Sequence, residues 1–247
     1  MFWKKKNKPP VTNDDQNWLD ENLSWLREVF TEEHFQSIKT VTLTKDFFNR
    51  DFNGSKEDAF FILNKIKELM RIENDNIILE FYNDSPVVLD DGSVLSTPSE
   101  DIDGSWQTAS GTYEQDENDN VILSLEEGQL KDTVSLIATI SHELAHEILL
   151  GEGWLEENDE YLTDLTAIFY GFGIFIGNSK FKFSSFNNGV ESGWESQAQG
   201  YLPLQVIAYA TAWLSVGRNE NVTYEEFLNP SLKKYFIQSL NFLNSKN

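Results

Sequence analysis

An uncharged stretch, rich in apolar side chains, runs from Leu165 to Ser179 and contains three glycines. A membrane-spanning helix needs about 18 or more apolar residues, so this stretch is too short to cross a bilayer. A helix that is apolar nearly all round is instead buried inside a protein. The stretch therefore predicts a helix in the core of the fold.

The composition excludes several classes of function. The chain has 247 residues, of which 40% are hydrophobic, enough for one large core. Its 41 acidic and 19 basic residues give a formal net charge of −22, which repels nucleic-acid phosphates and anionic lipids. The absence of cysteine excludes disulfides, thiolate metal ligands and a cysteine nucleophile.

The N-terminal sequence MFWKKKNKPP is positively charged, but no apolar segment follows it. It therefore lacks the pattern of a signal peptide. We expect a cytoplasmic protein without a membrane span and without a nucleic-acid partner. The three lysines at 4–6 are typical of a solvated tail.

Apolar periodicity and turn residues predict the order of the elements. The predicted helices cover 17–35, 56–72 with Ser55 as N-cap, 133–150 with Asp132 as N-cap, 159–175 and 204–218, followed by one or two short helices. The predicted strands cover 40–44 and 77–82, a hairpin turning at Asp91-Gly92, and a second hairpin that includes Val121–Leu125.

This order predicts an α+β fold. A small mixed or antiparallel sheet would lie beside one long helix, and the C-terminal half would be mostly helical. Residues 1–12 form a predicted flexible tail and 13–247 a single domain, within which 13–90 could form an N-terminal lobe.

The motif HExxH occurs once, as His142-Glu143-Leu144-Ala145-His146. Residues four apart lie on one face of a helix, so both imidazoles can reach one metal ion. Glu143 is rotated by about 100° from His142, where it can reach a metal-bound water rather than the metal itself. His142 and His146 are thus predicted to bind one Zn²⁺ per chain, with Glu143 as general base.

A catalytic zinc site usually has a third protein ligand, which elimination narrows to a carboxylate. The chain has no cysteine, its one other histidine is His34, and no histidine follows the motif in the extended HExxHxxGxxH pattern. No methionine follows Met70, so a Met-turn is also excluded.

The next predicted helix offers Glu160 and Asp164, which are four residues apart in an otherwise apolar helix. Glu160 is predicted as the zinc ligand, and Asp164 as the partner of a histidine ring N–H. The reverse assignment stays open. Glu157 and Asp159 are weaker candidates, because they lie in an acidic connection.

The two motifs together resemble the gluzincin branch of zinc metallopeptidases, the thermolysin-like arrangement. In that branch the second helix carries Glu-x-x-Ser/Thr-Asp, and Thr163 occupies the Ser/Thr position. The gap from His146 to Glu160 is 14 residues (160 − 146), shorter than in thermolysin-like enzymes, which implies a tight helix–loop–helix. The resemblance implies a zincin-like fold, hydrolysis of peptide bonds, and an edge strand that binds extended substrate. Val121–Leu125 is the segment expected to be that strand.

The chain as a whole is also similar to a family of bacterial soluble zincin-like proteins without an established substrate. The resemblance rests on WLREVF, FFNRDFNGSKEDA, the HELAH helix, LTDLTAIFYGFGIFIGNS and SGWESQAQGYLP. It implies the fold and the zinc site, but no particular reaction.

A zinc peptidase also needs a donor for the oxyanion, commonly tyrosine or histidine. Tyr201 is the first candidate, and the alternatives are Tyr161, Tyr170, Tyr113 and His34. Trp194 and Gln197 could line the pocket or belong to a packed loop. The rival hypothesis is a metal-binding interaction or regulatory protein that has this fold but no peptidase activity.

Overall fold

A computed structural model describes residues 8–83, 87–88, 94–95, 111–118, 120–186 and 202–246. The fold is mixed α+β and mostly helical, as predicted, with a three-stranded mixed sheet. The chain divides into two compact units. The sheet unit comprises Asp51–Asn158 and Gly193–Gly200, and the helical unit comprises Met1–Arg50, Asp159–Ser192 and Tyr201–Asn247. The prediction of a single domain for 13–247 stays a prediction.

The sheet unit contains one mixed sheet, one small hairpin and two long helices. Its elements are α3 (Lys56–Met70), β1 (Ile77–Tyr82), β2 (Val87–Val88), β3 (Val94–Leu95), β4 (Gly111–Gln115), β5 (Val121–Glu126), the 3₁₀ turn η1 (Glu127–Lys131), α4 (Thr133–His146) and the π-turn η2 (Glu147–Gly151). Strands β2 and β3 pair antiparallel, and so do β4 and β5. The strand pairing of both predicted hairpins is therefore confirmed.

The first helix of this unit begins where the sequence predicts. Ser55 and Asp58 form a capping box, in which each side chain accepts a hydrogen bond from the other residue's backbone N–H. The Asp58 carboxylate also accepts from the backbone N–H groups of Asn53 and Gly54, at 2.8 and 3.0 Å. The capping-box bonds satisfy N–H groups that the start of the helix cannot pair internally, and the other two bonds satisfy N–H groups of the loop that precedes it.

The sheet has the order β1-β5-β4, so β5 is the central strand. It pairs parallel with β1 and antiparallel with β4. The expectation that Val121–Leu125 is an edge strand is therefore wrong. The reason is a long-range parallel pairing with Ile77–Tyr82, which no local pattern reveals. Among the described residues, β4 is the outer strand on the side that contacts α4.

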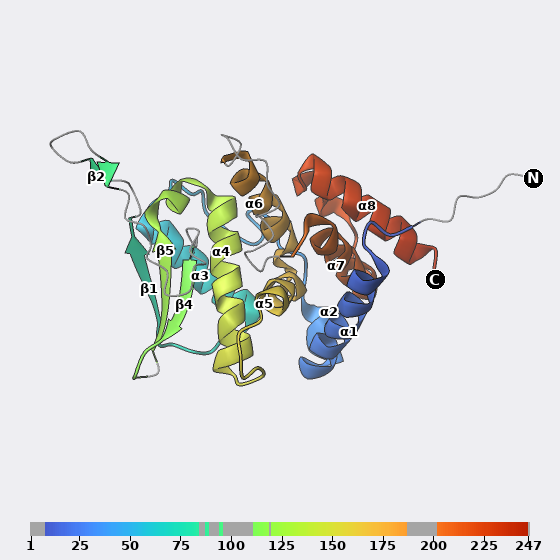
Figure 1. Cartoon of the computed structure of the whole chain (residues 1–247), viewed down its shortest axis with the longest axis horizontal. Coiled ribbons are helices and arrows are strands. Elements are labelled where there is room, and N and C mark those ends of the chain that lie inside the picture. The colour runs from blue at the N-terminus through green and yellow to red at the C-terminus, as the bar shows by residue number, and fades with distance from the viewer. Residues whose placement is uncertain are drawn as a thin grey trace, which may run out of the picture. The chain divides into compact units, whose positions relative to one another are not determined.

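One face of this sheet is covered by α3 and α4 (Figure 1). Val121, Leu123 and Leu125 of β5 are buried on that face. Phe81 of β1 pairs with Leu125, and its ring lies 5.9 Å from that of Phe60 on α3. Because side chains alternate along a strand, Gly111 and Tyr113 of β4 point the same way.

The helical unit has no strand among its described residues. Its elements are α1 (Asn13–Val29), α2 (Glu32–Ser37), α5 (Glu160–Ala167), the π-turn η3 (Ile168–Phe172), α6 (Gly173–Phe186), α7 (Leu204–Gly217), the 3₁₀ turn η5 (Thr223–Phe227) and α8 (Pro230–Asn244). The apolar helix α7 packs against α1, α6 and α8.

Two local predictions for this unit are wrong. The helix predicted over 17–35 is broken into α1 and α2 at Thr31, which has φ 66° and caps α2 through its side chain. Residues 40–44 are not a strand. Instead, Val41 donates to the carbonyl of Gly171 at 2.9 Å. Gly171 has φ 99° inside η3, so the helix kinks there. The kink leaves the Gly171 carbonyl able to accept a hydrogen bond from a residue outside the helix.

All residues from 165 to 179 are buried, as predicted. The kink at Gly171 divides this stretch between η3 and α6. None of the described helices combines the length and apolar character that a membrane span requires.

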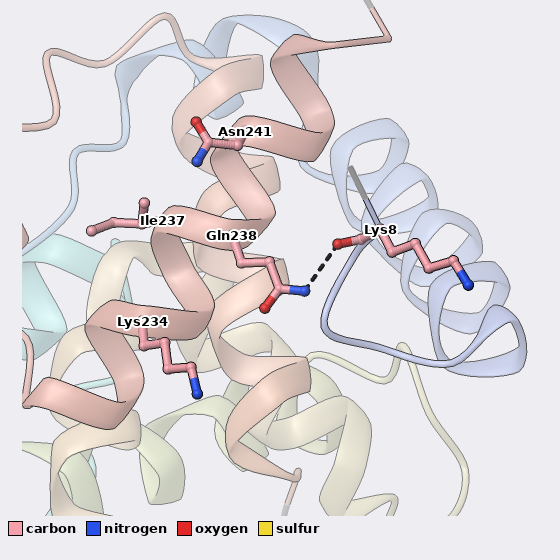
Figure 2. Close-up of a pocket in the computed structure, with 5 residues that line it drawn as sticks. All are labelled: Lys8, Lys234, Ile237, Gln238 and Asn241. Atoms are coloured by element: carbon pink, nitrogen blue, oxygen red, sulfur yellow. Dashed lines mark hydrogen bonds between the residues drawn. The ribbon is translucent and has the colours of Figure 1, made fainter. Parts of the chain in front are cut away.

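A hollow of about 270 Å³ lies between the segment at Lys8 and one face of α8 (Figure 2). Gln238 donates to the Lys8 carbonyl at 2.9 Å, and Lys234, Ile237 and Asn241 complete the lining. None of the predicted site residues lines this hollow.

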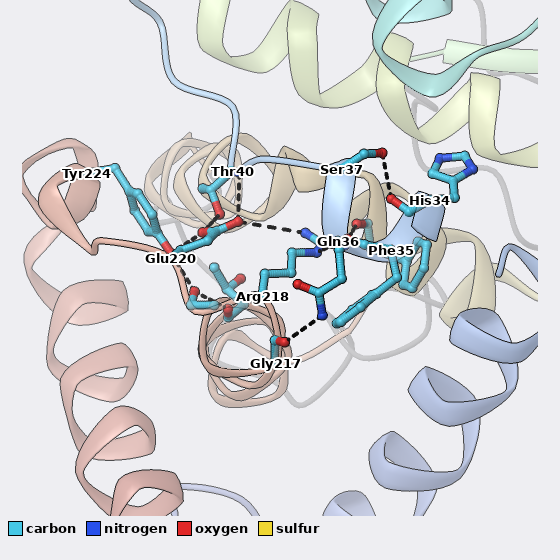
Figure 3. Close-up of polar contacts among 12 residues, drawn as sticks. His34, Phe35, Gln36, Ser37, Thr40, Gly217, Arg218, Glu220 and Tyr224 are labelled. Carbon is cyan, nitrogen blue, oxygen red and sulfur yellow. Dashed lines mark hydrogen bonds and ion pairs between the residues drawn. The ribbon is translucent and has the colours of Figure 1, made fainter. Parts of the chain in front are cut away.

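The buried Arg218, which follows α7, bonds to α2 and to η3 of the helical unit (Figure 3). Arg218 donates to the carbonyl of Phe35 at 3.0 Å and to the carbonyl of Phe169. Its guanidinium also lies 4.0 Å from Glu220, whose carboxylate accepts from Thr40. Burial lowers the pKa of Arg218 to about 10, and the Glu220 charge opposes this shift. We call these residues the Arg218 cluster.

Candidate metal centre

The two histidines of the motif lie in the buried half of α4. Asp132 caps this helix by accepting from the backbone N–H of Val134 at 3.2 Å and the hydroxyl of Ser135 at 2.8 Å. Every residue from Ser135 to His146 is buried. The rings of His142 and His146 are 4.9 Å apart and nearly perpendicular, at 86°. Two imidazoles one turn apart therefore face the same side of α4, as the sequence predicts.

Glu160 is the first residue of α5. Asp159 caps that helix by accepting from the backbone N–H of Leu162 at 3.0 Å. The Thr163 hydroxyl donates to the Asp159 carbonyl at 2.9 Å and closes the first turn. A carboxylate in the first turn is favoured by the partial positive charge of the helix N-terminus. The local sequence thus fixes Glu160 at a capped helix start.

His142, His146 and Glu160 form a group that could hold a metal ion. One ligand atom from each residue lies within 4.8 Å of the other two. Both histidines are buried and Glu160 is half-buried. Two imidazole nitrogens and one carboxylate oxygen suit Zn²⁺, although this ligand set does not by itself select one divalent ion.

Glu143 is buried as well, with 5% of its surface exposed. A Cβ atom built on Gly111 would lie 3.1 Å from Glu143 Oε1 and 2.6 Å from Thr139 Cγ2. Strand β4 can therefore approach α4 this closely because residue 111 has no side chain. Thr139 is held on its other side, where its hydroxyl donates to Gln129 at 2.7 Å.

A further buried acid follows the motif directly. Glu147 accepts a hydrogen bond from the Tyr113 hydroxyl at 2.9 Å and another from Asn74 Nδ2 at 2.7 Å. The Tyr113 ring lies 5.7 Å from the His146 ring. Burial, followed by the bond to Glu147, raises the pKa of Tyr113 well above its usual value. The phenol therefore stays protonated and can donate.

Asp164 is buried, and its Oδ2 accepts from the backbone N–H of Leu202 at 2.9 Å. Lys180 donates to the carbonyl of the same residue. Burial lowers the pKa of Lys180 to about 8, and the negative charge of Asp164 opposes this shift. Asp164 and Lys180 thus hold both backbone polar groups of Leu202. The predicted bond from a histidine ring to Asp164 stays a prediction.

The remaining candidates are divided between described and undescribed parts of the chain. Tyr201, Trp194 and Gln197 lie outside the described residues. Tyr161 is 44% exposed. The other three described candidates have neighbours within their own units: His34 packs edge-on against Tyr170, and Tyr113 lies beside His146. Both weaker ligand candidates, Glu157 and Asp159, are exposed, and Asp159 is the cap of α5.

Sequence reasoning missed Glu147, Asn74 and Gly111. A signal for Glu147 was present, because it lies four residues after Glu143 on a helix that has no other acidic residue after Asp132. No local pattern links Glu147 to Tyr113, since the two are 34 residues apart.

Comparison with models of protein families, with curated proteins and with solved structures gave no match. The function must therefore be argued from the residues of this chain.

Proposed function

We propose that this protein is a zinc-dependent hydrolase and, more specifically, a peptidase. The observation that supports this most directly is the convergence of ligand atoms from His142, His146 and Glu160. The order of the motifs, HELAH and then E-Y-L-T-D, adds the resemblance to gluzincins. Zinc bound there would polarise a substrate carbonyl and lower the pKa of a coordinated water.

Glu143 has the position of a general base in this proposal. It follows His142 directly, so its carboxylate is rotated away from the two histidines on the same helix. Glu143 would take a proton from the attacking water and deliver it to the leaving nitrogen. Its carboxylate is buried, with 5% of the residue exposed, beside Gly111 of β4.

Two further roles belong to the proposal. Asp164 would accept the ring N–H of a ligand histidine and so fix its tautomer. Tyr201 would donate to the oxyanion, and it directly precedes Leu202, which Asp164 and Lys180 hold.

The test uses the zinc-loaded full chain and a mixed peptide library. Removing a general base typically lowers the rate by 10²–10⁴-fold, so Glu143→Gln should lose about that much cleavage while it keeps its zinc. Glu156→Gln is the matched control, because Glu156 is an exposed acid that is not a candidate ligand. Cleavage that survives in Glu143→Gln would contradict the assigned base. A wild-type protein that holds zinc but cleaves no peptide would favour the interaction-protein hypothesis.

A further inference from the structure

We propose that Glu147 is a positioning residue that sets the distance between strand β4 and the motif helix α4. This inference rests on the proposed function and deepens it. It concerns how the buried side chains around the site are held, and it adds no metal ligand.

The first step is the shared face of the helix. Thr139, Glu143 and Glu147 are spaced four residues apart, so they form one row along α4 and η2. Strand β4 meets this row at two places. Its Gly111 lies against Thr139 and Glu143, and its Tyr113 bonds to Glu147. Residues 111 and 113 are two apart and therefore point to the same side of the strand.

The second step is how Glu147 is bound. Its two carboxylate oxygens accept from different segments, Oε2 from Tyr113 on β4 and Oε1 from Asn74 before β1. Asn74 in turn accepts from the backbone N–H of Asn76 at 2.8 Å, and Asn76 accepts from that of Val121 at 2.9 Å. Glu147 thus connects the end of the motif helix to both outer strands of the sheet.

The third step is the effect on the site. The hydroxyl bond to Glu147 holds the Tyr113 ring, which packs 5.7 Å from the His146 ring. The same strand carries Gly111, which lies against the Glu143 carboxylate. A shift of β4 would therefore move a neighbour of a metal ligand and a neighbour of the base together. A carboxylate at 147 can accept both bonds at once, one on each oxygen.

The experiment measures metal binding rather than turnover. Cobalt(II) replaces zinc as a spectroscopic probe, and its visible absorption reports ligand geometry. Zinc affinity is measured by competition with a chelator. Glu147→Leu and Tyr113→Phe are compared with Glu114→Gln, in which an exposed acid next to Tyr113 on β4 is changed. The double variant Glu147→Leu with Tyr113→Phe completes a cycle.

Loss of the groups that orient metal ligands typically costs 10–100-fold in affinity, so we expect a loss of about 10-fold in Glu147→Leu. Tyr113→Phe should change the cobalt spectrum in the same direction. The double variant should be no weaker than Glu147→Leu, because the two residues act as one unit. Glu114→Gln should match the wild type. Tyr113→Phe removes a single hydroxyl, so it tests the inference even where Glu147→Leu fails to fold.

Wild-type spectrum and affinity in both Glu147→Leu and Tyr113→Phe would overturn the inference and leave the proposed function standing. Additive losses in the double variant would also overturn it, since they would mean that the two residues act separately. A wild-type chain that takes up neither cobalt nor zinc would instead overturn the proposed function, and this inference with it.

Discussion

Two polar groups of residues differ in what they contain, the Arg218 cluster of the helical unit and the motif residues His142, His146 and Glu160. In the Arg218 cluster a cation meets two backbone carbonyls and a carboxylate. Two of the guanidinium nitrogens donate to these carbonyls, and the third, Nη1, lies 4.0 Å from Glu220 without a hydrogen bond to any described residue, so groups of the protein offset part of the cost of burial. The motif residues instead bring two imidazoles and a carboxylate together within 4.8 Å. Those residue types are metal ligands, and a bound cation would hold them together.

This comparison distinguishes buried polar groups that stabilise the fold from polar groups that would bind a metal ion. Within the sheet unit Glu147 belongs to the first kind, because both of its oxygens accept from protein donors. His142 and His146 belong to the second kind in this account. Stability measurements should therefore depend on zinc for the motif residues and be independent of zinc for the Arg218 cluster.

The largest effect on stability is expected for Arg218→Met. Removing one partner of a buried charged cluster typically costs 3–5 kcal/mol, so the free energy of unfolding should fall by about that amount. The variant would leave the carbonyls of Phe35 and Phe169 without this donor. Urea unfolding, with and without a chelator, measures the loss, which should be the same in both.

The matched control is Arg27→Met, because the Arg27 side chain is 38% exposed and pairs with Glu32 at the surface. Such pairs contribute less than about 1 kcal/mol. If Arg218→Met cost no more than Arg27→Met, the Arg218 cluster would not have the stabilising role described above.

A smaller effect is expected for Gly111→Ala. The added methyl would meet Thr139 and Glu143, and overpacking of this kind typically costs 1–3 kcal/mol. Unlike Arg218→Met, this variant should also lower zinc affinity, because it displaces β4 from α4. Thr112→Ala, on the opposite face of the same strand, is the control. Unchanged stability together with unchanged zinc affinity would show that the close approach of β4 has no consequence.

The smallest effect concerns pH and Lys180. Its pKa is lowered to about 8 in the folded chain by burial, from 10.5. Between pH 8 and pH 10.5 the Lys180 side chain binds more protons in the unfolded chain than in the folded chain, so the free energy of unfolding rises with pH. We expect a gain of about 1–2 kcal/mol between pH 8 and pH 9.5, measured by urea unfolding. Lys180→Met should remove this rise. A rise of equal size in the variant would assign it to other groups.

The sequence predicted what depends on neighbouring residues. The N-cap at Asp132, the helical spacing of His142 and His146, and the N-cap at Ser55 are all local, and the structure has each of them. Elimination led to a carboxylate as the third ligand, because the chain has no cysteine and few histidines. The structure places a Glu160 oxygen within 4.8 Å of the histidine ligand atoms, and its role as a ligand stays a prediction.

What the sequence did not predict depends on contacts between distant segments. The parallel pairing of β1 with β5 made β5 central, although its own pattern fits any half-buried strand. Residues 40–44 are β-prone, yet Val41 bonds to the carbonyl at the Gly171 kink rather than to a strand. The bond from Tyr113 to Glu147 likewise becomes visible only once β4 lies on α4.

The most direct test of the central claim is the zinc content of the purified full chain after zinc is supplied, measured by elemental mass spectrometry beside His146→Ala. The account predicts about one zinc per chain in the wild type and a loss of that zinc in His146→Ala, since a catalytic site has three protein ligands and this variant keeps two. Absence of zinc from the wild type, or equal zinc in the two proteins, would contradict the assignment of His142, His146 and Glu160 as a metal centre.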